Sequence, residues 1–308
     1  MQYYFAPLEG LTDRIYRKLH HQYFPGLDRY YLPFLSPTSH RALTPKESKD
    51  LPPASSLGYC GIPQLLTKNA DDFIWMAKQC ADLGYPEVNL NLGCPSGTVT
   101  AKGKGAGMLR DLTALDCFLH DIYRQAPLPI SIKTRIGFES PEEFPSLMEI
   151  FNRYPVAQLI IHPRVRNSFY KGNVDLSAFE IAVNTSSAPL CYNGDLTSVS
   201  DISHIAQKFP SIDAVMLGRG LIGNPGLMQS TKIELETLEA FHNALFSSYI
   251  ESFGGARNAM FRMKEHWSYM LTHFENNERL AKKLRKCTDT VQFHEITREI
   301  FQTLTWNP

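Results

Sequence analysis

The sequence predicts an α/β protein in which a (β/α)8 (TIM) barrel, residues 1–230, precedes a small all-α domain, residues 231–308. Over the first three quarters of the chain, short apolar runs alternate with longer amphipathic segments, which is typical of a parallel sheet with crossover helices. Eight such units fit the length of a (β/α)8 barrel, about 250 residues. From residue 233 onward the pattern is wholly helical.

The strands of the predicted barrel are its short apolar runs, at residues 3–6, 29–32, 62–66, 88–92, 130–133, 159–162, 190–193 and 214–217. Helical spacing of apolar residues predicts the crossover helices, at residues 13–23, 71–83, 113–124, 141–152, 176–183 and 198–208. The second unit is the weakest, because segment 33–53 is rich in prolines and shows no clean helical stripe. A doubly wound open sheet is the alternative architecture.

The C-terminal region is predicted to form a small helical bundle, with helices at 233–253, 256–273, 279–286 and 290–304. Its first helix is acidic, and its third carries a cluster of basic residues: Arg279, Lys282, Lys283, Arg285 and Lys286. A solvated helix face explains such a run most simply.

Composition limits the possible partners. The 308 residues include 31 Lys and Arg against 31 Asp and Glu, so nucleic acid must be bound through local patches. No apolar run approaches the roughly 20 residues of a membrane helix, and residues 1–10 lack the features of a signal peptide. We therefore expect a soluble, cytoplasmic protein with no membrane partner.

The cysteines are scattered, and none forms a C-x-x-C pair. This spacing argues against a structural zinc site, and we expect no metal. In a reducing compartment these residues would be free thiols. They are Cys60, Cys80, Cys94, Cys117, Cys191 and Cys287.

Polar residues follow most of the predicted strands. In a (β/α)8 barrel the carboxyl ends of the strands form the mouth of the active site, and core packing alone does not explain polar residues after six or seven successive strands. No Ser/His/Asp arrangement or paired carboxylates occur among them, which argues against a hydrolase. They include Glu9, Gln64, Asn91, Lys133, Arg135, His162, Asn193, Asp195 and Arg219.

Residues 218–223 match G-x-G-x-x-G after the last predicted strand. No further strand follows to complete a dinucleotide-binding unit, so we interpret the motif as the phosphate site that barrels build after strands seven and eight. Asn224 and Pro225 are predicted to open a helix facing the phosphate, and Arg219 would add a charge-assisted contact. The alternative is a glycine-rich turn that closes the barrel.

Cys94 lies just past a buried strand, before Pro95 and a glycine-rich loop, 96–107. The glycines suggest a mobile lid, and Lys102 and Lys104 suggest that it closes on an anion. Lys133 ends an apolar strand, where an unpaired ammonium is costly, so it should face an anion or an electron-rich ring. With His162 on the next strand, these donors suit a phosphorylated cofactor on which negative charge develops.

With these motifs in order, the chain resembles the tRNA-dihydrouridine synthases, FMN-dependent barrel enzymes that reduce uridine in RNA. The similarity runs from Ala6 to about Met228. Its most specific part is the run Asn-Leu-Gly-Cys-Pro-Ser at 91–96. The other motifs lie at residues 6–13, 133–137, 162–164, 192–195 and 216–220. The opening Ala-Pro-Leu replaces the family's usual Ala-Pro-Met, and residues 33–63 match no particular subgroup.

The resemblance implies a role for each of these residues. Cys94 would be the general acid that protonates C5 while reduced flavin delivers a hydride to C6. NADPH or NADH would be the electron donor, and tRNA the partner, its target base flipped into the pocket. FMN would contact Pro7, Leu8, Glu9, Gln64, Lys133, His162, Asn193, Gly194, Asp195, Gly218 and Arg219. The substrate would contact Asn91, Arg135, Tyr170, Lys102 and Lys104.

The family uses such a helical tail to hold RNA, and other basic residues would extend its positive surface: Arg14, Arg17, Lys18, Lys102, Lys104 and Lys171. Three alternatives remain open. The first is the same chemistry directed at ribosomal RNA. The second alternative is an FMN oxidoreductase that acts on a free pyrimidine, like dihydroorotate or dihydropyrimidine dehydrogenase. Such an enzyme needs no basic tail. A non-catalytic RNA-binding barrel is disfavoured by the retention of Cys94, Lys133 and His162. Monomer is the default oligomeric state.

Overall fold

The computed structural model describes residues 1–38 and 40–307. Contacts divide the chain into two compact units. The first comprises Met1–Pro7, Asp28–Gly194 and Ser203–Met216, and the second Leu8–Leu27, Asp195–Ile202 and Leu217–Pro308. The functional division expected at residue 230 stays a prediction. In the described part of the chain, no helix has the length and apolar character needed to span a membrane.

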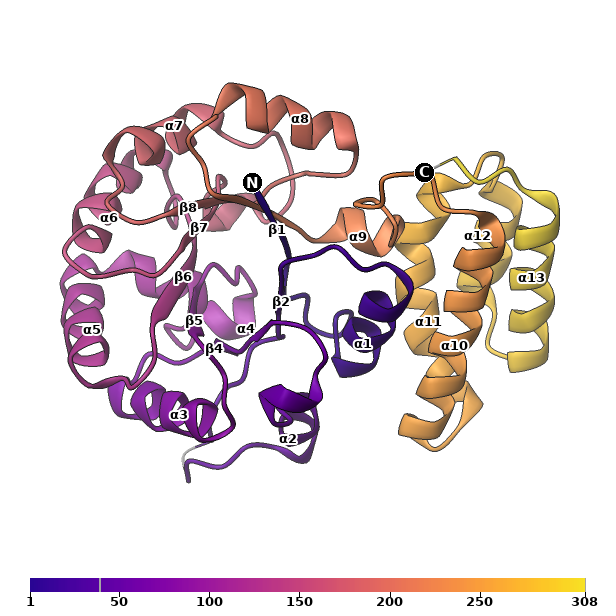
Figure 1. Cartoon of the computed structure of the whole chain (residues 1–308), viewed down its shortest axis with the longest axis horizontal. Coiled ribbons are helices and arrows are strands. Elements are labelled where there is room, and N and C mark those ends of the chain that lie inside the picture. The colour runs from indigo at the N-terminus through magenta and orange to yellow at the C-terminus, as the bar shows by residue number, and fades with distance from the viewer. Residues whose placement is uncertain (39, 308) are drawn as a thin grey trace. The chain divides into compact units, whose positions relative to one another are not determined.

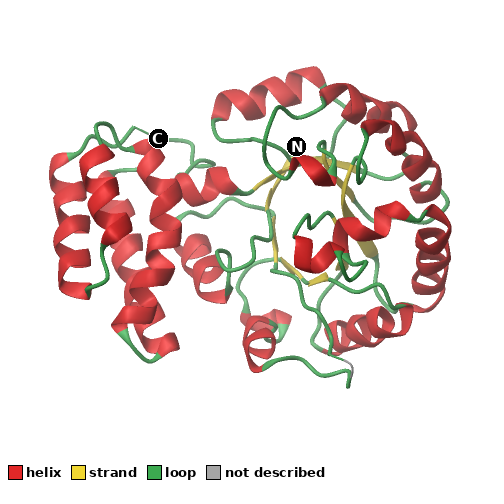
Figure 2. Cartoon of the chain, turned by 180° about the vertical axis from the view of Figure 1, so that it is seen from behind, coloured by secondary structure: helices red, strands yellow, loops and turns green. Residues whose placement is uncertain are grey.

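The first unit is built on a parallel sheet that closes on itself. The strand order is β3-β2-β1-β9-β8-β7-β6-β5-β4. The two outermost strands of this order, β3 and β4, are consecutive in the chain, so the ring is complete and the predicted barrel is confirmed (Figure 2). The strands are β1 (Gln2–Phe5), β2 (Arg29–Tyr31), β3 (Gly61–Ile62), β4 (Gln64–Leu65), β5 (Val88–Leu92), β6 (Ile130–Arg135), β7 (Leu159–His162), β8 (Leu190–Tyr192) and β9 (Ala214–Leu217).

Pro63 divides the strand expected at 62–66 into β3 and β4. Proline has no N–H to donate to a ladder, so the strand is interrupted there. The neighbouring carbonyls still pair on both sides. Ile62 O accepts from Leu32 N at 2.9 Å, and Pro63 O accepts from Asn89 N at 2.8 Å. The chain therefore passes at this residue from pairing with β2 to pairing with β5, which closes the barrel.

The longer helices of the first unit lie outside the strands (Figures 1 and 2). Several start at a side-chain cap, as Asn69, Asp111 and Asp175 each accept a backbone N–H of the first turn. These helices are α3 (Ala70–Asp82), α5 (Leu112–Gln125), α6 (Phe144–Phe151) and α7 (Leu176–Thr185); α8 (Val199–Lys208) is shared by the two units.

A short helix, α2 (Pro45–Asp50), lies in the segment that showed no helical stripe. Its six residues are too few to display an apolar period. Instead, Thr44 and Glu47 form a capping box that starts the helix. The capping box, together with proline at the first helical position, is the feature of the sequence from which this helix could have been predicted.

The barrel interior is a packed core rather than a pore. Its apolar side chains come from β1, β2, β3, β7, β8 and β9, with Ala6 just beyond β1. The buried cluster consists of Tyr4, Ala6, Tyr31, Ile62, Ile160, Cys191, Ala214 and Met216. On β5 and β6 the buried side chains include polar ones, Asn89 and Ser131.

The second unit is helical, as expected for the C-terminal region. It also contains α1, because the ring of Tyr16 stacks on His266 with centroids 4.8 Å apart, and Tyr249 donates a hydrogen bond to Asp13 at 3.2 Å. Its helices are α1 (Arg14–Tyr23), α9 (Arg219–Gly223), α10 (Leu235–Phe253), α11 (Ala256–Met270), α12 (Glu278–Lys286) and α13 (Thr290–Thr303).

The helix expected to open at Asn224 and Pro225 is absent, because residues 225–228 form a turn. Asn224 Oδ1 accepts the N–H of Gly226 at 3.1 Å, which holds the backbone in a turn. Gly226 also packs closely: a Cβ there would lie 2.1 Å from Ile233 Cγ2. The helix that follows the last strand is α9, which begins directly at Arg219.

Three buried histidines make the second unit sensitive to acid. Burial lowers the pKa of His20 to about 3 and the pKa values of His242 and His266 to about 4. The unfolded chain binds these protons near pH 6.5, so stability is complete above that pH and is lost as pH falls toward 4. We expect each histidine to cost up to about 1.4 kcal/mol per pH unit in this window.

Urea unfolding between pH 7 and 4.5 measures this loss. His242→Phe is the matched variant, because the ring lies among Trp267, Phe293 and Phe301 and its Nε2 is buried without a partner. The variant should show a pH slope shallower by about one proton. An unfolding free energy that does not change over this range would contradict the prediction.

Candidate active site

A chain of hydrogen-bonded, buried side chains crosses β4, β5 and β6. Asn91 Nδ2 donates to Gln64 Oε1 at 2.7 Å, and Gln64 Nε2 donates to Asn89 Oδ1 at 2.8 Å. Asn89 Nδ2 then donates to Ser131 Oγ at 2.8 Å. Each amide therefore has a defined orientation. Gln64 and Asn91 were predicted as site residues, whereas Asn89 and Ser131, both fully buried, were not.

Cys94 is held through its backbone. Asn91 Oδ1 accepts the N–H groups of Gly93 and Cys94 at 3.0 and 2.9 Å, and Cys94 O accepts from Ala106 N at 3.2 Å. Gly105, at φ +58°, packs so closely that a Cβ there would lie 3.0 Å from Cys94 Cβ. The half-buried thiol is thus fixed just beyond the end of β5.

The loop expected to be a mobile lid is folded as α4 (Gly97–Thr100) and a 3-10 helix, Gly105–Arg110. Its glycines have a packing reason, since a Cβ on Gly107 would lie 2.8 Å from Thr100 O. Lys104 Nζ donates to Ser36 Oγ at 2.9 Å, while Lys102 is exposed. Glycine content here reflects close contacts and left-handed backbone, so it is no evidence of a lid.

Lys133 is paired with Asn91 in the register of β5 and β6. Its half-buried ammonium has no hydrogen-bond or ion-pair partner among the described residues. Burial, with a smaller contribution from the charge of Arg135, lowers the pKa of Lys133 to about 8. A partly desolvated cation without a partner is suited to an anionic or electron-rich ligand.

Arg135 ties the cysteine loop to the loop after β7. Its Nε donates to Gly93 O and its Nη1 to Val165 O, both at 2.9 Å. Its guanidinium lies 5.4 Å from the centre of the Tyr170 ring, and burial lowers its pKa. Arg135 is 2% exposed, so these contacts of its guanidinium are buried inside the site.

His162 lies opposite Arg135 in the register of β6 and β7. Arg164 Nη1 is 3.1 Å from His162 Nε2. A guanidinium only donates, so Nε2 accepts and the neutral ring carries its proton on Nδ1. The edge of Tyr170 meets the imidazole at a centroid distance of 5.9 Å. The structure thus brings together the predicted residues Arg135, His162 and Tyr170.

Asn193 and Gly194 follow β8. Asn193 Nδ2 donates to Met216 O at 2.7 Å, which ties the end of β8 to β9. A Cβ on Gly194 would lie 2.9 Å from Val174 Cγ1, so only glycine fits there. Pro7, in the same unit, is half-buried beyond the end of β1.

The remaining predicted site residues belong to the second unit. Arg219 Nη2 donates to Asp195 Oδ1 at 2.8 Å, and Asp195 has φ +46°. Gly218 precedes α9, whose Gly220 is so close to Leu196 O that a Cβ would lie 2.3 Å from it. Leu8 N donates to Thr12 Oγ1 at 2.8 Å, and Glu9 is exposed.

The positive surface expected on the second unit is smaller than predicted. Arg17 is fully buried and donates to Thr12 O at 2.6 Å, so it is not part of any surface; its exposed neighbours are Arg14 and Lys18. On α12, Arg279 and Lys283 both pair with Glu299.

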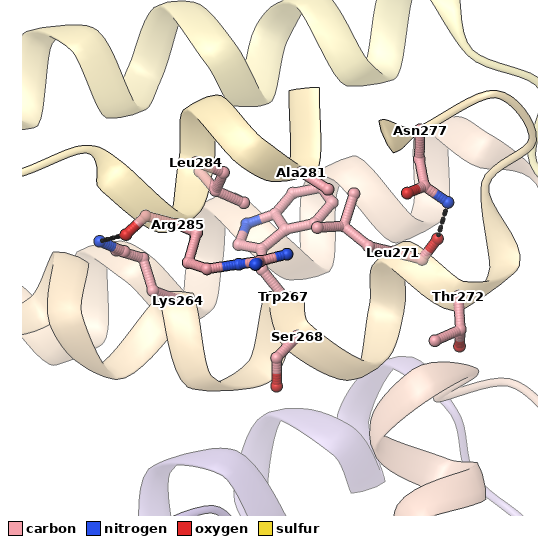
Figure 3. A pocket seen from close by; sticks show the side chains of 9 residues that line it. All are labelled: Lys264, Trp267, Ser268, Leu271, Thr272, Asn277, Ala281, Leu284 and Arg285. Carbon is pink, nitrogen blue, oxygen red and sulfur yellow. Dashed lines mark hydrogen bonds between the residues drawn. The ribbon is translucent and has the colours of Figure 1, made fainter. Parts of the chain in front are cut away.

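A pocket of about 290 Å³ lies between α11 and α12 (Figure 3). It is lined by Trp267, Leu271 and Leu284, with polar groups at the rim. Lys264 belongs to this rim, but its ammonium donates to the carbonyls of Arg285 and Cys287 at 2.9 and 2.6 Å. Lys264 therefore caps the C-terminal end of α12.

The closed parallel barrel, with a thiol, a lysine, an arginine and a histidine at the ends of β5, β6 and β7, defines a (β/α)8-barrel enzyme. Among the described residues, no three His, Cys, Asp or Glu side chains are grouped so as to hold a metal ion. The sequence profile described as "Dihydrouridine synthase (Dus)" matches residues 4–305. The chain belongs to the dihydrouridine synthase family, a family of oxidoreductases.

Relatives of known name agree with this. The chain is 28% identical over 235 residues to the tRNA-dihydrouridine(16) synthase of Pseudomonas putida, covering 74% of this chain and 72% of that protein. It is 24% identical over 227 residues to tRNA-dihydrouridine synthase B of Pasteurella multocida, covering 73% and 67%.

Among solved structures, the chain is similar to the old yellow enzyme from Trypanosoma cruzi. The TM-score is 0.53 at 10% identity, and the match covers 77% of this chain and 91% of that one. Morphinone reductase matches with a TM-score of 0.52 at 12% identity, covering 77% and 88%. At these identities the similarity concerns the fold alone.

Proposed function

We propose that this protein reduces the C5=C6 bond of a uridine in tRNA to dihydrouridine, with FMN as cofactor and NADPH or NADH as electron donor. This proposal rests on the side chains near the ends of three adjacent strands, where hydrogen bonds and strand register fix the positions of Cys94, Lys133 and His162. Membership of the dihydrouridine synthase family and the names of the relatives support the reaction and the tRNA substrate.

The donors of the first unit fit a flavin. Lys133 offers an ammonium without a partner, and Gln64, His162 and Asn193 offer polar groups at neighbouring strand ends. Gly218 and Arg219 of the second unit would hold the phosphate, with Pro7, Leu8, Glu9, Gly194 and Asp195 as further contacts. A bound flavin supplies the hydride that uridine receives at C6.

Cys94 supplies the other half of the reaction. Its thiol would donate a proton to C5 as the hydride reaches C6, and the thiolate would regain a proton from solvent. Arg135, and the N–H of Asn91 that Gln64 does not use, would stabilise negative charge on the uracil carbonyls. Asn91 has a second task, since its Oδ1 holds the backbone N–H of Cys94.

A uridine within folded RNA must leave its stack to reach such a site. Exposed cations, among them Lys102 and Lys171, would contact phosphates and so position the RNA without identifying the base. The pocket would then select the uracil. The monomeric state, the cytoplasmic location and the absence of a metal stay predictions.

The proposal is tested by mapping dihydrouridine, position by position, in unmodified total RNA incubated with the purified protein, FMN and NADPH. New dihydrouridine in a tRNA loop is the expected result and names the target position. Signal in ribosomal RNA alone would keep the chemistry and change the partner. A yellow protein that oxidises NADPH but modifies no RNA would favour a free pyrimidine as substrate.

The pKa of Lys133 predicts how cofactor binding depends on pH. An electron-rich ligand favours the charged ammonium, so affinity for FMN should fall as pH rises above about 8, approaching tenfold per pH unit. Titration of the apoprotein with FMN between pH 7 and 9.5, followed by flavin fluorescence, measures this. Lys133→Met should bind FMN weakly with no such decline. A wild-type affinity that is constant over this range would exclude contact between Lys133 and the flavin.

A further inference from the structure

Phe169 is an exposed aromatic residue in the loop after β7. Its side chain is 41% exposed, and the next residue is Tyr170, whose ring contacts Arg135 and His162. A single exposed apolar side chain is ordinary on a protein surface, so the meaning of Phe169 depends on its backbone conformation and its neighbours.

The backbone at Phe169 is strained. Its φ of +51° and ψ of −103° lie outside the regions that a bulky L-residue adopts readily. Glycine or asparagine would adopt this backbone conformation at a lower energetic cost. The surrounding structure must therefore hold Phe169 in its strained conformation. Such strain is found preferentially where a side chain must be presented to a ligand.

One face of the Phe169 ring is occupied by a cation held in place. The guanidinium of Arg166 lies 5.1 Å from the ring centre. Arg166 is itself fixed, since it donates to Thr100 Oγ1 at 3.0 Å and to Asn167 Oδ1 at 3.1 Å. The ring is therefore supported on one side and open to solvent in part.

Exposed charged residues lie on the loop of Phe169 and on the segments that contact it, and they include one carboxylate, Glu139, next to Phe138, whose O accepts from Asn167 N at 3.3 Å. Lys171 is exposed two residues later in the same loop, and Lys102 is exposed two residues after Thr100, the contact of Arg166. A rigid aromatic face among cations is the arrangement with which proteins bind unpaired nucleotides, the base stacking on the ring and the phosphates facing the cations.

We propose that Phe169 is a stacking site for the nucleotide next to the target uridine. The Tyr170 ring contacts Arg135 and His162 and is itself 48% exposed, so the two neighbouring rings would serve successive nucleotides of one extruded strand. The inference rests on the proposed function, because it takes the uridine to occupy the site beside Tyr170.

The test compares Phe169→Ala with Phe169→Tyr for binding to unmodified tRNA, to a uridine-centred trinucleotide and to UMP. Phe169→Ala should weaken tRNA and trinucleotide binding about 5- to 100-fold, and Phe169→Tyr should restore most of it, because loss of one stacked base has an effect of this size. UMP binding should be unchanged. Oxidation of NADPH in the absence of RNA should also be unchanged, which shows that the flavin site is intact.

A third variant separates stacking from folding. Phe169→Gly relieves the strained backbone, so it should unfold at the same or a higher temperature than the wild type while binding tRNA as weakly as Phe169→Ala. Equal tRNA affinity in wild type and Phe169→Ala would overturn the proposal. Equal weakening for UMP would also overturn it, because Phe169 would then face the target uridine itself.

These readouts measure binding, so they do not depend on the reaction. If the wild type bound tRNA in a Phe169-dependent manner but formed no dihydrouridine, the proposed function would fail and the stacking site would remain. If dihydrouridine formed normally in Phe169→Ala with unchanged tRNA affinity, only the stacking site would fail.

Discussion

Cys94→Ala should form dihydrouridine about 10²- to 10⁴-fold more slowly than the wild type while NADPH still reduces its flavin. General acid catalysis by a positioned side chain contributes a factor of this size. The variant leaves Lys133, His162 and the other proposed flavin contacts in place. Stopped-flow absorbance follows flavin reduction, and quantification of dihydrouridine in a single-turnover experiment follows the transfer to RNA.

Cys117→Ala is the matched control. Cys117 is a free and exposed cysteine on α5, so its loss should alter neither rate. Equal single-turnover rates for Cys94→Ala and the wild type would remove Cys94 from the role of acid. A flavin that NADPH no longer reduces in Cys94→Ala would show instead that the thiol supports the cofactor site.

The barrel was predictable because its signal is local. Each strand is a short apolar run and each helix has its own period, so eight repeats identify the architecture without any knowledge of pairing. The exceptions are also physical. Proline at 63 interrupts a strand whose carbonyls still pair, α2 is too short to show a period, and an Asx turn at Asn224 replaces the helix that Pro225 suggested.

The site was predictable where its residues follow strands directly. Arg135 and His162 are in register across β6 and β7, and Lys133 lies two residues before Arg135, so their positions in the sequence are sufficient to place them near one end of the barrel. The hydrogen bonds from Gln64 through Asn89 to Ser131 depend on which side chains face each other across three strands. Sequence alone does not state that register.

Other features have no sequence signal at all. The positive φ of Phe169 could not be predicted from the residue type, because phenylalanine rarely adopts that conformation. The burial of Arg17 was missed for a different reason. Its neighbours Arg14 and Lys18 are exposed on α1, and a basic run does not reveal which of its members faces inward.

Arg135→Lys should lower both stability and activity although it keeps the charge. A guanidinium reaches Gly93 O and Val165 O at once, whereas an ammonium is a single point that cannot match both. Leaving one buried carbonyl without a donor costs about 1–3 kcal/mol of unfolding free energy. The loop that carries Cys94 would shift, and misplacement by about 1 Å is enough to reduce the rate by about 10²-fold.

Urea unfolding and single-turnover dihydrouridine formation measure the two effects, with Arg153→Lys as control. Arg153 forms an exposed ion pair with Asp116 at 2.8 Å, so its replacement should change the unfolding free energy by less than about 0.5 kcal/mol. Arg135→Met distinguishes geometry from charge. If Arg135 positions the loop, Lys and Met should both be impaired. Full activity in Arg135→Lys with loss in Arg135→Met would mean that the positive charge alone matters, and that the two carbonyl contacts do not orient Cys94.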